Sequence, residues 1–95
     1  MSVTDELAQA ITQMKVVEFR YKGNWRSAEP HAVGYSNRGV LTLCAWQLSG
    51  GSGQDWRDFH VEQMLDVTVT EENFDGPRDG YNPSDKTMST LICAL

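Results

Sequence analysis

Apolar residues near the start of the chain recur at spacings of four and three, on Leu7, Ile11 and Met14. Residues with that spacing lie on one face of an α-helix. Ser2 or Thr4 is placed to cap the helix N-terminus, where Asp5 and Glu6 would meet the positive end of the helix dipole. The pattern therefore predicts one amphipathic helix over residues 3–14.

From Val16 the pattern changes to strict alternation. One set of side chains is apolar (Val17, Phe19 and Tyr21) and the set between them is polar (Glu18, Arg20 and Lys22). Alternation of this kind is typical of a half-buried strand. A tight turn containing Gly23 follows, and then a returning strand that Pro30 interrupts, which marks an edge or a bend because proline donates no ladder hydrogen bond.

After a second turn at residues 36–39, the stretch LTLCAWQ (residues 41–47) carries no charge and looks buried on both faces. Leu41, Leu43 and Ala45 make one face; Thr42, Cys44 and Trp46 make the other. We expect the first face to point into the core and the second to be covered by the N-terminal helix or by a second subunit. Trp46 is read as a core residue, with a ligand-stacking platform as the alternative.

The rest of the chain adds a glycine-rich loop over residues 48–55 and two further strands, one from Trp56 and one from Met64. Residues 75–83 are irregular. The tail carries Met88, Leu91, Ile92 and Leu95 at helical spacing behind Ser84, so we predict a short C-terminal helix, with a terminal strand as the alternative. About five antiparallel strands would expose two edges, which closure into a small barrel removes.

The composition is that of an ordinary globular domain with a formal net charge of −5. This balance argues against a non-specific DNA coat, which needs clustered Lys and Arg, but it leaves room for a local basic pocket. No stretch approaches the ~20 apolar residues of a membrane span and no signal peptide is visible, so we expect a cytoplasmic protein. Cys44 and Cys93 are read as reduced thiols, with a disulfide as the alternative; zinc and other cofactors are not expected.

At this point a set of motifs resembles the WYL domain, a bacterial family named for a Trp-Tyr-Leu tripeptide in its central strand. The matching positions follow one another in family order: the alternating strand at Val17, Phe19 and Tyr21; Arg26 before Pro30; the tripeptide at Leu41, Thr42 and Leu43; Arg57 with Phe59; and Met64. The resemblance covers about residues 7–74. It implies one mainly β domain over residues 1–95, similar to a small SH3-like or Sm-like barrel, with a helix at 1–15, the barrel at 16–74 and an extension at 75–95.

The chain departs from the family pattern at three points. The tripeptide keeps only its leucine, as Leu43, because Leu41 and Thr42 replace the Trp and the Tyr. Gln63 stands where many members carry a second arginine. Finally, we expect no preceding helix-turn-helix, although the family is usually the sensor half of a transcription factor. The resemblance implies a regulatory domain that binds a ligand, in some members single-stranded DNA or a nucleotide-like molecule.

The candidate ligand-binding residues are Arg26, Thr42, Trp56, Arg57 and His60. A guanidinium group presents a rigid fork that suits phosphate oxygens and stacks on bases. Trp56 is the preferred stacking residue because it adjoins Arg57 and the glycine-rich loop. The alternative is that the arginines are structural, with Arg57 paired to Asp55 or Asp58 and Arg26 paired to Glu29.

No motif indicates catalysis, so we expect a non-enzymatic protein. The first hypothesis is a ligand-binding domain that takes a nucleotide, an oligonucleotide or a similar anion and passes the event to a partner. The second is a protein-interaction module that pairs through an edge strand or as a homodimer. The third is a protein that sequesters a nucleotide signal.

Overall fold

The computed structural model describes residues 2–50, 53–81 and 88–95. Its α-helix, α1 (Val3–Gln13), confirms the predicted N-terminal helix. Ser2 is the cap rather than Thr4: its hydroxyl accepts from the Asp5 backbone N–H, and the Asp5 carboxylate accepts from the Ser2 N–H. No described helix is long and apolar enough to cross a membrane.

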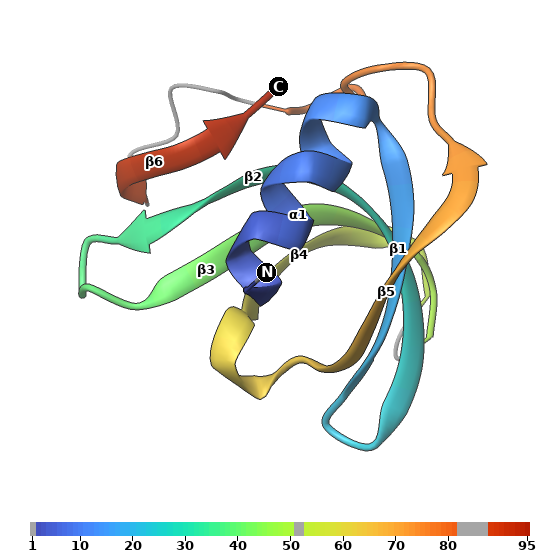
Figure 1. The fold of residues 1–95 in the computed structure, drawn as a ribbon, viewed down its shortest axis with the longest axis horizontal. Coiled ribbons are helices and arrows are strands. Elements are labelled where there is room, and N and C mark those ends of the chain that lie inside the picture. The colour runs from blue at the N-terminus through green and yellow to red at the C-terminus, as the bar shows by residue number, and fades with distance from the viewer. Residues whose placement is uncertain (1, 51–52, 82–87) are drawn as a thin grey trace.

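Six antiparallel strands form the sheet that makes up most of the fold: β1 (Lys15–Tyr21), β2 (Asn24–Ser36), β3 (Leu41–Ser49), β4 (Asp55–His60), β5 (Leu65–Asn73) and β6 (Met88–Ala94). The main order is β4-β3-β2-β1-β5, and β6 pairs with β2. A 3-10 turn, η1 (Val61–Gln63), joins β4 to β5. The sheet curves around α1 (Figure 1), but the described β4 and β5 do not pair, so the sheet is open and the predicted closed barrel is not supported.

Strand β2 is the longest strand and bends in the middle. Its first half pairs with β1 and its second half with β6 along the same edge, while β3 follows the other edge. The register shifts between Pro30 and Ala32. Because proline has no N–H to donate, the break in the ladder falls where a donor is already missing. Of the two predicted readings of Pro30, the bend is confirmed and the edge is wrong.

The core lies between the concave face of the sheet and α1. Leu43 and Ala45 of β3 are fully buried there, as predicted, and Leu41 packs partly buried against them. The helix contributes Leu7, Ala10 and Ile11 to the same core. We call this concave, helix-covered side the inner face. The prediction that α1 covers the Trp46 face of β3 is therefore wrong.

A segment after β5, residues 74–81, covers the other side of the sheet, which we call the outer face. The Arg78 guanidinium lies 5.3 Å from the centre of the Trp46 ring system, and Tyr81 stacks 6.1 Å from Trp56. Phe74 is buried and stacks at 5.5 Å on His31 of β2. The chain thus covers both of its sheet faces with segments that flank the five-stranded part in sequence.

The C-terminal residues form strand β6, so the predicted helix is wrong and the alternative strand is confirmed. Apolar spacing there was compatible with a helix, but the second half of β2 offers a free row of backbone donors and acceptors. Pairing Val33 with Cys93 and Tyr35 with Thr90 satisfies those groups. Ser84, the predicted cap, lies outside the described residues.

Neither cysteine forms a disulfide, and both are partly buried. Cys93 faces the helix, where its Sγ donates to the Ala8 carbonyl at 3.5 Å. Cys44 lies on β3 opposite Asp58 of β4 and Ala32 of β2. The thiols therefore occupy separate environments, as expected for reduced cysteines rather than for a disulfide.

The core assignment predicts that Leu43→Ala lowers the free energy of unfolding by about 2–5 kcal/mol, because it removes a fully buried leucine and leaves a cavity. Leu65→Ala is the matched control, since Leu65 is 54% exposed on β5 and should change stability by no more than about 0.5 kcal/mol. Urea denaturation of both variants measures the difference. Equal losses would contradict this placement of the core.

Candidate functional site

Arg26 lies on the inner face of β2, at the end where that face meets the loop after β3. Its register partner on β1 is the core residue Phe19. One guanidinium nitrogen donates to the Gln47 side-chain oxygen at 3.0 Å, and the other donates to the Tyr21 carbonyl at 3.2 Å. The guanidinium also lies over the rings of Tyr21 and Phe59, 5.4 and 5.9 Å from their centres. Its Nε is buried without a hydrogen-bond partner.

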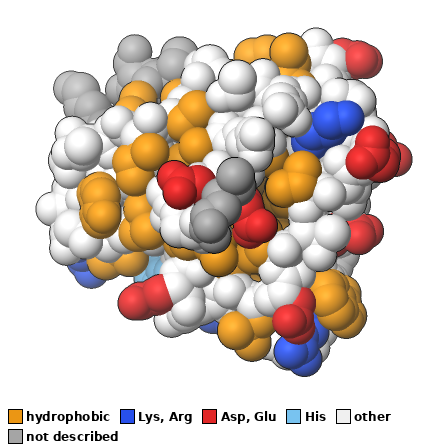
Figure 2. Space-filling model, in the orientation of Figure 1, with side chains coloured by type: hydrophobic (Ala, Val, Ile, Leu, Met, Phe, Trp, Pro, Cys, Tyr) orange, Lys and Arg blue, Asp and Glu red, His pale blue; other side chains and the backbone are white. Residues whose placement is uncertain are grey.

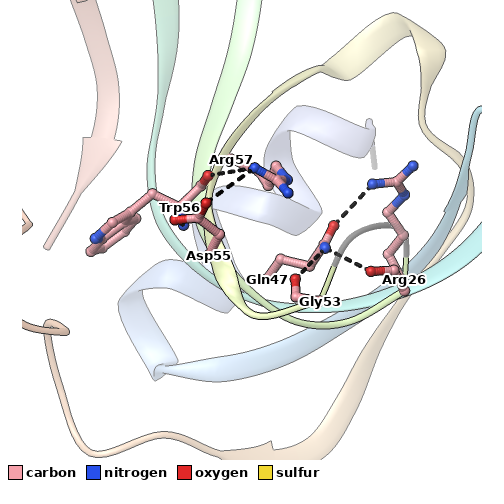
Figure 3. A network of polar contacts seen from close by, with 7 residues as sticks. Arg26, Gln47, Gly53, Asp55, Trp56 and Arg57 are labelled. Atoms are coloured by element: carbon pink, nitrogen blue, oxygen red, sulfur yellow. Dashed lines mark hydrogen bonds and ion pairs between the residues drawn. The ribbon is translucent and has the colours of Figure 1, made fainter.

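Gln47 links Arg26 to the glycine-rich loop. It is fully buried, and its amide nitrogen donates to the carbonyls of Gly50 and Gly53 at 2.7 and 2.6 Å (Figure 3). Sequence reasoning did not single it out. The available signal was its position, because Gln47 continues the apolar face of Leu43 and Ala45, where a polar side chain must find partners inside the protein.

Arg57 lies on the same face as Arg26, because its register partner is the core residue Ala45. In Figure 3 it points to the side of the sheet where Gln47 and Arg26 lie. It donates to the Asp55 carboxylate at 3.5 Å and to the Trp56 carbonyl at 3.4 Å. The structure thus brings the two predicted arginines to one face, two strands apart.

Of the two ion pairs predicted as structural alternatives for these arginines, one is present and the other is not. The ion pair of Arg57 with Asp55 is present, although it is long and the Asp55 side chain is largely exposed. The pair of Arg26 with Glu29 is wrong, because Glu29 binds Arg78 at 2.7 Å. Within residues 2–50, 53–81 and 88–95, Arg26 forms no ion pair.

Trp56 lies on the outer face and points away from Arg57 (Figure 3). It packs edge-on against Trp46 at 5.5 Å and against His31 at 4.9 Å, and Tyr81 stacks on it. A partly buried ring in such a cluster is a packing residue. The structure therefore does not place Trp56 beside the arginine site.

Thr42 and His60 are register partners on β3 and β4, also on the outer face. They line a pocket of about 240 Å³ together with Ser36, Arg38, Val40, Asp58 and Met88. The Thr42 hydroxyl donates to the Val40 carbonyl at 2.9 Å. The five predicted residues thus fall in three places: Arg26 with Arg57, Trp56 alone in the aromatic cluster, and Thr42 with His60.

A polar cluster that sequence reasoning missed, centred on the buried Glu29 and His31, holds the 74–81 segment in place. The Glu29 carboxylate accepts from Arg78 at 2.7 and 3.1 Å, and the His31 Nε2 accepts from the Arg78 backbone N–H at 3.0 Å. The His31 Nδ1 lies 2.7 Å from the Glu29 carbonyl, so the tautomer with its proton on Nδ1 satisfies both contacts. Nothing in the spacing links positions 29 and 31 to position 78.

Burial and hydrogen bonding shift the pKa values of the groups around Glu29. Desolvation lowers the pKa of His31 below 6.5, against the opposing influence of Glu29. The hydrogen bonds that Arg78 donates to the Glu29 carboxylate raise the pKa of Arg78, and burial raises the pKa of Tyr81. His31 is therefore neutral in the folded protein at neutral pH, as its role as acceptor for the Arg78 N–H requires.

Comparison with known protein families relates most of the chain to a described domain. A family model described as WYL domain matches residues 2–69, which leaves the 74–81 segment and β6 outside it. No curated protein and no solved structure matches the chain.

The His31 cluster predicts a loss of stability in mild acid. Because the folded-state pKa of His31 is lowered, the unfolded chain binds more protons below pH 6.5, so the free energy of unfolding falls as the pH drops below 6.5 toward the folded-state pKa. Urea denaturation across this range should show a smaller fall for His31→Gln than for the wild type. His60→Gln, which changes an exposed histidine, should keep the wild-type fall. A His31→Gln curve parallel to the wild type would contradict the assignment.

Proposed function

The chain belongs to the WYL domain family, and we propose that it is a non-enzymatic regulatory domain that binds a nucleotide, an oligonucleotide or a similar anion at Arg26 and Arg57. Regulatory ligand sensing is the role often linked to the family name. The location of the binding site at Arg26 and Arg57 is supported by the side-chain contacts of this chain.

The observation that carries the proposal is the setting of Arg26. Its guanidinium is fixed by a neutral amide and a backbone carbonyl, over two aromatic rings, and no carboxylate of the described chain neutralises it. A structural arginine in a partly buried position normally has an acidic partner. An arginine held in place by neutral groups keeps its charge available for an anion from solution.

Arg57 adds a second cation on the same face. The Arg26 guanidinium lies over the ring of Phe59, which is two residues after Arg57 on β4. Both arginines therefore lie near the same part of β4. The long Arg57–Asp55 contact is an exposed ion pair, which contributes little and which a phosphate can displace. Two guanidinium groups on one face match the several oxygens of a phosphate group.

Direct binding tests the proposal. Isothermal titration with short single-stranded oligonucleotides and with mononucleotides should give binding that weakens as salt is raised. Arg26→Gln and Arg57→Gln should each lower the affinity about tenfold or more, since a hydrogen bond to a charged group contributes about 1.5–3 kcal/mol. Lys15→Gln is the charge-matched control, because Lys15 begins β1 at the end remote from Tyr21 and bonds to Asn73. The absence of binding to any of these ligands would refute the proposal.

A second candidate function, self-association, is supported by β6. Met88–Ala94 contains no charged residue, and the consecutive residues Leu91 and Ile92 are both nearly half exposed. Figure 2 shows hydrophobic side chains gathered on the side of the molecule where Figure 1 places β6. An uncharged apolar edge strand lacks the charges that normally prevent pairing with another chain. If β6 pairs with β6 of a second copy, neither strand places a charged side chain in the contact. The net charge of −5 on each chain lies outside β6.

This candidate predicts a dimer that depends on β6. Sedimentation equilibrium of the wild type should show a concentration-dependent dimer, and Leu91→Lys should shift it to monomer by placing a charge in the contact. Leu65→Lys is the control, because Leu65 is as exposed but lies on β5, and it should leave the dimer intact. A wild-type monomer at all concentrations would exclude self-association.

A further inference from the structure

The tip of the β1–β2 hairpin concentrates positive charge in an acidic protein. Residues 20–26 read RYKGNWR. They hold Arg20, Lys22 and Arg26, which are three of the eight Lys and Arg of the chain, and no acidic residue. Tyr21 and Trp25 stand between the cations. Cations interleaved with aromatic rings are the combination that binds single-stranded nucleic acids.

The turn itself makes the tip well defined. Lys22 and Gly23 form a two-residue connection, both with positive φ (51° and 83°), which matches the right-handed twist of the two strands. The register then places Tyr21 opposite Asn24 and Arg20 opposite Trp25. Arg20 and Trp25 therefore lie together on the outer face of the hairpin, whereas Arg26 points to the inner face.

Trp25 is the exposed ring of this tip. At 60% exposed it is the most exposed of the large hydrophobic residues in the described part of the chain. The Arg20 guanidinium lies 5.8 Å from the centre of its ring system, and Asp66 anchors Arg20 at 2.7 Å. An anchored cation beside the indole restricts the ring, so less side-chain freedom is lost when something stacks on it.

An open pocket of about 420 Å³ lies beside the indole. Its lining is Glu18, Trp25, Arg26, Ser27 and Ser49, so it borders an arginine of the anion site. The Glu18 carboxylate and the two serine hydroxyls offer acceptors for the N–H groups of a nucleobase. An aromatic wall with a few polar groups is typical of pockets that take a flat, partly polar ligand.

We infer that Trp25 is a stacking platform for a nucleobase, with Arg20 and Lys22 of the same hairpin tip binding the phosphates of a single strand. The inference rests on the proposed function and deepens it, because the pocket beside Trp25 is also lined by Arg26 of the anion site. It transfers the stacking role from Trp56, which packs in the outer-face cluster, to an indole that solvent reaches. Recognition by stacking is tolerant of sequence, since every base has a π-face.

Two oligonucleotides that differ only in their bases separate the contribution of base stacking from that of phosphate binding. One is a short single-stranded oligonucleotide, and the other is an abasic strand of the same length, which keeps the phosphates. By fluorescence anisotropy with labelled strands, Trp25→Ala should bind the base-bearing strand about 5- to 150-fold more weakly than the wild type and the abasic strand equally well. Trp25→Phe should retain most of the affinity.

Tyr35→Ala is the matched control, because Tyr35 is an exposed aromatic residue at the opposite end of β2. It should leave both affinities unchanged, and thermal melts of all variants check that each is folded. If Trp25→Ala binds the base-bearing strand as the wild type does while Arg26→Gln weakens both strands, the stacking platform is wrong and the anion site stands. If the wild type binds neither strand, both the platform and the proposed function are wrong.

Discussion

The bend of β2 at Pro30 is the constraint on which the rest of the structure depends. A straight strand of thirteen residues would pair with one neighbour on each edge, but the bent strand pairs with β1 and then with β6 on the same edge. The bend also curves the sheet enough for one short helix to cover its concave face. It places His31 at the register shift, where the side chain meets the 74–81 segment on the outer face.

This arrangement separates the chemistry of the two faces. At one end of the inner face lies Arg26, which neutral hydrogen-bond partners hold in place. The outer face is closed by a segment that a single buried carboxylate and a neutral histidine hold in place. That segment and β6 lie beyond residues 2–69, so the part of the chain that matches the family is covered by parts that do not. The family relationship therefore extends to Arg26 and Arg57 but not to the 74–81 segment or to β6.

The sequence predicted the features that depend on residues close together in the chain, namely the N-terminal helix and the buried faces of the strands. Alternation placed Phe19 and Leu43 in the core, and spacing located α1, because local periodicity decides which side of an element is apolar. It did not predict β6, since a short apolar tail suits a helix or a strand until a partner edge is known. It grouped Trp56 with Arg57 by adjacency, although adjacent strand residues point to opposite faces. It missed the Glu29–Arg78 pair because contacts that distant in sequence leave no local pattern.

Net charge is a poor guide to the ligands that one part of this surface could bind, because screening shortens the range of electrostatic forces. At physiological ionic strength screening reduces interactions beyond about 8 Å. The acidic residues Glu71 and Glu72 lie near the Lys15 end of β1, roughly 20 Å from the hairpin tip at ~3.3 Å per residue. A phosphate placed at the tip would therefore respond to the charges beside it, the cations Arg20 and Lys22 and the carboxylates Asp66 and Glu18, more than to the overall charge of −5. The net charge instead acts on the approach of an anion at low salt, so it opposes encounter while the local cations favour the bound state.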